Sequence, residues 1–169
     1  MTYSDTLVAW HDFYVAAGTI SATLVGLLFV GISLHVKVVA AHNDVRRLAR
    51  VTLSTFFTVA VISLVALIPT DRPDNSGVAF VAIGIVALTT IVPALEVLGA
   101  RGHRTLPRYV LFSRFGIVLA TALGLIAVGI GLIGADFHDA LAGLVGIVLL
   151  MLVVSVRNTW DLLVTLASK

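Results

Sequence analysis

The chain of 169 residues contains no cysteine, only four prolines and few charged residues. Without cysteine it can form no disulfide, thiolate nucleophile, iron–sulfur cluster or cysteine-based zinc site. Charged residues make up 12% of the chain, whereas soluble proteins carry roughly 25%. Apolar residues reach 59%, more than a domain of this size can bury in water. The composition therefore excludes both a soluble globular protein and a disordered chain.

Sequence motifs of common enzyme classes are also missing. The chain has no HExxH zinc-protease motif, no GxSxG nucleophile motif and no Walker loop. It also lacks the pair of intramembrane aspartates used by one class of membrane proteases. We therefore expect neither an enzyme nor a protein that carries a cofactor.

Five apolar stretches are long enough to cross a bilayer, which takes about 17–25 residues in a helix. They comprise residues 13–34, 51–68, 78–98, 109–133 and 139–160. Turn-forming residues separate the later stretches, notably in the segment Pro69–Gly77. The sequence thus predicts an all-α fold: one integral membrane domain over residues 1–169, built as a bundle of five transmembrane helices.

The Lys and Arg residues gather on one side of this topology. Of the eleven, only Arg72 lies on the other side. Because cytoplasmic loops carry an excess of Lys and Arg, the N-terminus is expected outside and the C-terminus in the cytoplasm, in the cytoplasmic membrane. The first stretch follows Asp5 and Asp12 rather than a basic segment, which indicates an uncleaved membrane anchor.

Six of these arginines flank the membrane on the predicted inner side in two clusters. They are Arg46, Arg47, Arg50, Arg101, Arg104 and Arg108. The clusters fix the topology, and they can also contact anionic lipid headgroups, a phosphorylated solute or an acidic partner. Because they lie so close to the bilayer, we expect no nucleic acid as a partner.

Small and hydroxyl-bearing residues follow one face of the first stretch. The face comprises Gly18, Thr19, Ala22, Thr23, Gly26 and Ser33. Small residues four apart form a groove that lets two helices approach closely. The hydroxyls can bond to their own backbone, bond to another helix or line a wet path. The face therefore predicts either packing within the bundle or the interface or pore of a homo-oligomer.

Two other stretches repeat parts of this pattern. The second carries hydroxyls at Thr52, Thr55 and Thr58. The fourth carries small residues at Gly116, Ala120 and Gly124, followed by Gly129 and further glycines. Both patterns indicate close helix contacts.

Glu96 is the only carboxylate within an apolar stretch, and it follows Pro93 by three residues. A carboxylate inside a membrane can relay protons or coordinate a cation. The alternative is an ion pair with Arg114 across a short connection at the cytoplasmic edge of the membrane, which the position of Glu96 two residues from the end of its stretch favours.

Histidines and aspartates gather on the predicted outer side. They are His11, Asp12, Asp136, His138 and Asp139. Such residues can bind a divalent cation, but their spacing matches no metal-binding motif. Asp136 and Asp139 are also what the start of a helix selects. We therefore expect no metal site.

The two ends of the chain resemble a known group. The residues that carry this are the segment Trp10-His11-Asp12-Phe13, the run Gly26–Val30 with Ser33, and the pattern RNxWDLL at Arg157–Leu163. They look like a group of small prokaryotic polytopic membrane proteins. The resemblance implies a fold of about five spans, and no catalytic or binding residue is carried over with it.

Two functions follow from these features. The first is a small homo-oligomeric channel or transport protein for ions or small solutes, with its path along the face of the first stretch. The alternative is a non-conducting accessory protein that binds another membrane protein or lipid. Membrane lipid and further copies of the chain are the expected partners in the first case.

Overall fold

The computed structural model describes residues 3–99, 108–134 and 137–167, with side chains for residues 3–43, 45–89, 116–134 and 139–164. The described chain is helical and contains no strand, so the all-α prediction is confirmed. The helices are α1 (Tyr3–Ala9), α2 (His11–Leu34), α3 (Val36–Ala41), α4 (Asn43–Ala66), α5 (Pro73–Gly99), α6 (Arg108–Ile133) and α7 (Phe137–Ala167).

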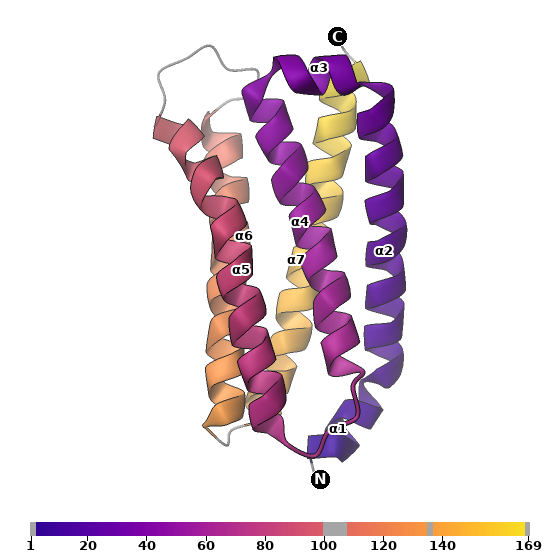
Figure 1. The fold of residues 1–169 in the computed structure, drawn as a ribbon, viewed down its shortest axis with the longest axis vertical. Coiled ribbons are helices and arrows are strands. Elements are labelled where there is room, and N and C mark those ends of the chain that lie inside the picture. The colour runs from indigo at the N-terminus through magenta and orange to yellow at the C-terminus, as the bar shows by residue number, and fades with distance from the viewer. Residues whose placement is uncertain (1–2, 100–107, 135–136, 168–169) are drawn as a thin grey trace.

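The five long helices run alternately up and down in one bundle (Figure 1). The short helix α1 lies at the end that holds the N-terminus, and α3 lies across the opposite end, near the C-terminus (Figure 1). Helix α4 contacts α2, α5 and α7, whereas α2 packs mainly on α4. Accordingly, 56% of the α4 span is buried in the bundle and only 17% of the α2 span. Helix α4 is thus central and α2 peripheral.

Among the residues whose side chains are described, four helices are long and apolar enough to cross a membrane. They are the segments His11–Leu34, Val45–Ala66, Gly116–Ile133 and Asp139–Val164. The part of α5 with described side chains, Pro73–Thr89, is apolar but shorter than a full span. The membrane character of the sequence is therefore confirmed in four helices, and the fifth span stays a prediction.

Several helix boundaries differ from the sequence prediction. Helix α5 begins at Pro73, inside the expected turn Pro69–Gly77, because proline at the first helical position has no N–H that the helix would need. Helix α4 begins at Asn43, where the pair Asn43-Asp44 is typical of a helix start, and reaches the apolar stretch 51–68 about two turns later. Helix α7 runs beyond the stretch 139–160 and ends at Ala167. The short helices α1 and α3 were not predicted.

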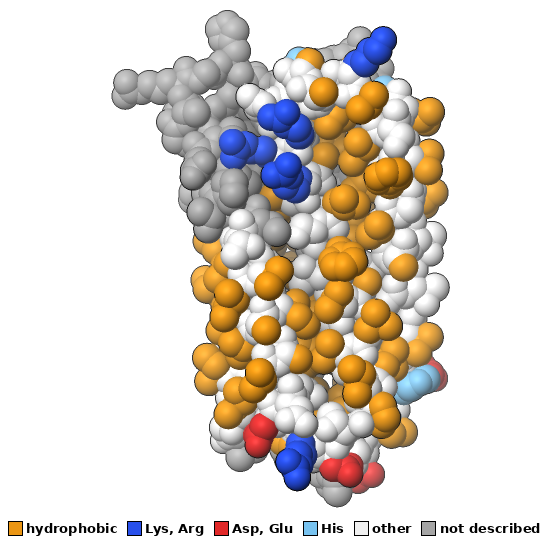
Figure 2. All heavy atoms as spheres, in the orientation of Figure 1, with side chains coloured by type: hydrophobic (Ala, Val, Ile, Leu, Met, Phe, Trp, Pro, Cys, Tyr) orange, Lys and Arg blue, Asp and Glu red, His pale blue; other side chains and the backbone are white. Residues whose placement is uncertain are grey.

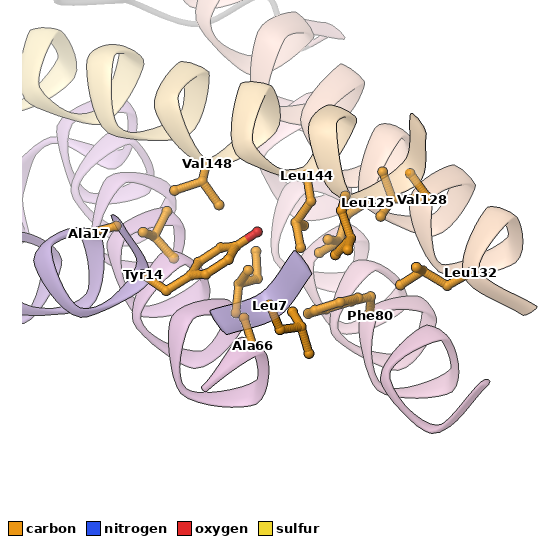
Figure 3. Close-up of a cluster of buried hydrophobic side chains, with 14 of the residues drawn as sticks. Leu7, Tyr14, Ala17, Ala66, Phe80, Leu125, Val128, Leu132, Leu144 and Val148 are labelled. Carbon is orange, nitrogen blue, oxygen red and sulfur yellow. The ribbon is translucent and has the colours of Figure 1, made fainter. Parts of the chain in front are cut away.

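Large apolar side chains fill the interior in two clusters. One, near α3, includes Leu28, Leu48 and Phe56. The other, near α1, includes Tyr14 and Phe80, and Figure 3 shows these two side chains among leucines and valines of α6 and α7. Because both clusters are closely packed, the core holds the helices together over most of their length.

Helices α5 and α6 make the most extensive contact, and their backbones touch through glycines. A Cβ atom at Gly77 would lie 2.6 Å from the carbonyl oxygen of Gly129, and one at Gly129 would lie 2.6 Å from that of Gly77. Gly129 belongs to the small residues that the sequence singled out on α6, and the other glycines of that pattern differ from one another. A Cβ at Gly116 would meet nothing within 4 Å, and Gly124 faces Ile147 of α7.

Candidate functional site

Most of the predicted face on α2 points away from the bundle. Thr19, Ala22, Thr23, Gly26 and Ser33 are exposed, and a Cβ at Gly26 would meet nothing within 4 Å. Within this set the exception is Gly18, which is turned toward α4, where its Cβ would lie 3.1 Å from that of Ser63. We call the five exposed residues the α2 outer face.

The hydroxyls of the α2 outer face bond to the backbone of their own helix. Thr19 and Thr23 donate to the carbonyls of Val15 and Thr19 at 2.8 and 2.9 Å, and Ser33 donates to that of Phe29 at 2.8 Å. Such bonds satisfy the O–H donor and leave lone pairs on the oxygen turned outward. The outer face is therefore polar without carrying an unpaired donor.

A cross-helix hydrogen bond from α2 comes from a residue outside the predicted face. The Ser21 hydroxyl is fully buried and donates to the carbonyl of Phe56 on α4 at 2.5 Å. The sequence did not single out Ser21, because Ser21 lies outside the line of hydroxyls formed by Thr19, Thr23 and Ser33. Its position on the α4 side of the helix, shared with buried Ala17 and Leu28, was the available signal.

Basic side chains gather at the α3 end of the bundle, where Figure 2 shows them as a blue group. Arg46 and Arg50 are exposed, and Arg46 donates to Asn43 Oδ1 at 2.6 Å. Arg47 is half-buried, and its Nη1 atom has no partner.

The side chains of the remaining predicted arginines and of Glu96 lie outside what the structure describes. Arg101 and Arg104 fall between the described segments, and Arg108 begins α6 without a described side chain. Glu96 lies on α5 and Arg114 on α6, again without described side chains. Their expected ion pair therefore stays a prediction.

Acidic side chains gather at the opposite, α1 end, which Figure 2 shows in red. His11 Nδ1 lies 3.1 Å from Asp12 Oδ1, and both side chains are exposed. Asp139 lies in the first turn of α7, as its helix-start role predicts. Asp136 and the His138 side chain lie outside the described part. The described residues contain no group of three metal-binding side chains.

A pocket of about 310 Å³ opens at this same end. Apolar residues of α1 and of the link between α4 and α5 line it, including Leu7 and Ile68, while His11 and Asp71 contribute polar groups. Nearby, burial raises the pKa of the Tyr3 phenol above its usual 10.0. Tyr3 and Leu7 are both buried, so one side of α1 packs against this end of the bundle.

Three further polar side chains, from α4 and α7, are buried inside the bundle. Thr52 of α4 and Ser155 and Asn158 of α7 are at most 1% exposed. Thr52 Oγ1, Ser155 Oγ and both amide atoms of Asn158 have no hydrogen-bond partner. We call them the inner polar group, because they lie in the half of the bundle near α3.

Comparison of the chain with protein-family models, with curated proteins and with solved structures found no match. Three features of the molecule bear on its function. They are the α2 outer face, the gathering of basic and acidic side chains at opposite ends of the bundle, and the filled interior.

Proposed function

We propose that this chain is a five-span protein of the cytoplasmic membrane that assembles with copies of itself into a channel or transport protein for ions or small solutes. The path lies between copies and is bordered by the α2 outer face. The exposed α2 outer face is the observation that carries this proposal, because it leaves small and polar residues uncovered on an otherwise apolar helix.

The packed interior supports a path between copies rather than through one. Tyr14, Leu28 and Phe56 are each at most 1% exposed and fill the bundle near both of its ends. A hydrated path within one copy would have to displace such side chains, whose burial is worth about 1.5–3 kcal/mol each. A path between copies leaves them in place and uses the uncovered glycine and hydroxyls of α2.

The charges support an orientation with the α3 end in the cytoplasm. Among the described side chains, every Lys and Arg except Arg72 lies at the α3 end, and every Asp except Asp161 lies at the α1 end. This is the distribution that the positive-inside rule associates with an outer N-terminus. Figure 1 places the two termini at opposite ends, as an odd number of spans requires, and α5 lies beside α6 within the bundle.

The test compares two glycines that both face open space. A Cβ meets nothing within 4 Å at Gly26 on α2 and at Gly146 on α7. Neither Gly26→Leu nor Gly146→Leu should therefore disturb the fold of one copy. We expect Gly26→Leu to lower both the oligomer size in lipid nanodiscs and the ion flux into liposomes, and Gly146→Leu to leave both unchanged.

Two results would contradict the proposal. If the wild-type protein is monomeric in nanodiscs and liposomes that contain it show no flux above empty vesicles, the chain is not an oligomeric channel. That outcome would favour the accessory function, in which the α2 outer face binds a different membrane protein. Equal effects of Gly26→Leu and Gly146→Leu would show that the α2 face has no special role.

A further inference from the structure

The positions of the inner polar group follow from helix contacts. Gly18 packs on Ser63, and Ser21 bonds to Phe56, which fixes the register of antiparallel α2 and α4. This register places Thr52 of α4 level with about Leu27 of α2.

Helices α2 and α7 run in the same direction (Figure 1). A Cβ at Gly31 of α2 would lie 3.0 Å from Cδ2 of Leu163 on α7. Leu27 is therefore level with about Thr159 of α7. Thr52 and Asn158 accordingly lie at the same height in the bundle. Ser155 lies about one helical turn, roughly 5 Å, deeper.

The hydroxyls of this group do not make the hydrogen bond to their own helix backbone that other hydroxyls of the chain make. Thr55 and Thr58 on α4, and Thr159 on α7, each donate to the carbonyl four residues earlier at 2.8 Å. Thr52 and Ser155 make no such bond although they lie in the same two helices. Their donors, like those of the Asn158 amide, are left for a partner outside the protein chain.

The chemistry of the group decides what this partner is. All three side chains are neutral, and each can both donate and accept hydrogen bonds. An ion of either sign would meet no compensating charge from them in a region of low dielectric. A bound cation would also leave the N–H groups of Asn158 unpaired. A neutral occupant that both donates and accepts hydrogen bonds, such as a water molecule, matches these three side chains.

We propose that Thr52, Ser155 and Asn158 form an internal hydration site in which ordered water bridges α4 and α7. The flanking residues agree with a confined site, because Leu48, Val154 and Leu162 belong to the buried apolar cluster around it. Water in this position satisfies the four unpaired atoms and links the central helix to the last one. The site is independent of any conduction between copies.

Substitution at the site distinguishes a hydrated group from an empty one. In a water-bridged group, removing one side chain leaves the others unpaired, so we expect Thr52→Val, Ser155→Ala and Asn158→Leu each to raise the unfolding equilibrium constant about tenfold. The triple variant removes every unpaired atom, so its effect should be smaller than the three single effects combined. The control is Thr159→Val, whose hydroxyl already bonds to its own helix.

An empty site predicts the opposite sign. Each single substitution would then remove an unsatisfied group and make the protein more resistant to unfolding, and that result would overturn the proposal. Strict additivity of the three substitutions would overturn it as well.

A direct measurement applies to the unaltered protein. We expect the side-chain amide protons of Asn158 to show magnetisation transfer from a long-lived water in NMR spectra of the protein in micelles, and Ser155→Ala to weaken that signal. An Asn158 amide that shows no contact with water would refute the site even if the variants fail to fold.

Discussion

The glycine contact between α5 and α6 makes a quantitative prediction. In Gly129→Ala the new Cβ would lie 2.6 Å from the Gly77 carbonyl oxygen, 2.7 Å from Val81 Cγ2 and 2.9 Å from Val81 N. Two of these three atoms belong to the backbone of α5 and cannot rotate away. The substitution therefore has to push two whole helices apart over the most extensive helix contact of the bundle.

The magnitude follows from two opposing effects. Overpacking a close contact costs typically 1–3 kcal/mol, and the backbone atoms place this case at the upper end. Replacing glycine by alanine within a helix returns about 0.5–1 kcal/mol. The net loss for Gly129→Ala is then about 2 kcal/mol. Gly146→Ala has the same helix gain without a clash, because its Cβ meets nothing within 4 Å, so it should stabilise the protein by about 0.5–1 kcal/mol.

The assay is reversible unfolding by SDS in mixed micelles, followed by circular dichroism. The two variants should differ by about 3 kcal/mol, or about 100-fold in the unfolding equilibrium constant, since 1.4 kcal/mol is tenfold. If Gly129→Ala is as stable as Gly146→Ala, the close approach of α5 and α6 is wrong.

A double variant adds a second check on the same contact. Gly77→Ala introduces a Cβ 2.6 Å from the carbonyl of Gly129, so both substitutions force the same two helices apart. Once one has separated them, the other should cost less, and the combined loss should be smaller than the two single losses together. Full additivity would mean that the two glycines do not share one contact.

Two further predictions concern hydrogen bonds of α2 and α1. Ser21→Ala removes the buried hydrogen bond to Phe56 and should destabilise the protein by about 1 kcal/mol. The control Ser33→Ala removes only a hydrogen bond within α2 and should have no measurable effect on stability. Equal effects of the two variants in the same unfolding assay would count against the cross-helix bond. Because burial raises the pKa of Tyr3 above 10.0 in the folded protein, the unfolded state loses its proton first, so stability should be full below pH 10 and fall as the pH rises further. Tyr3→Phe should flatten that fall, and a wild-type protein whose stability does not change above pH 10 would contradict the burial of Tyr3.

The lengths of the apolar stretches predicted most of the fold. The first stretch, residues 13–34, corresponds to α2, and the fourth, residues 109–133, to α6 almost to the residue. Length and hydropathy suffice here because a membrane span is defined by both. The start of α5 was misplaced because Pro73 stands among turn-forming residues, and proline both ends helices and begins them.

Contacts between helices were much harder to predict than the helices. The spacing of small residues singled out Gly26, which faces open space, and it marked Gly129 for a close contact without indicating that Gly77 would be its partner. A small residue permits close approach, but the neighbouring helix decides whether the approach occurs. The inner polar group escaped prediction for the same reason, because Thr52 and Asn158 are brought to one level only by the packing of α4 and α7.

The central place of α4 has a consequence for the making of the protein. Helix α4 is the second long helix to leave the ribosome, but its buried side packs against α5 and α7, which are synthesised later. Until α7 emerges, the side of α4 that packs on α7 has lipid beside it, although α2 and α5 are already in place. The packing around α4 is therefore complete only when the last helix has been inserted. A chain that stops after α6 leaves the α7-facing side of its central helix exposed to the bilayer.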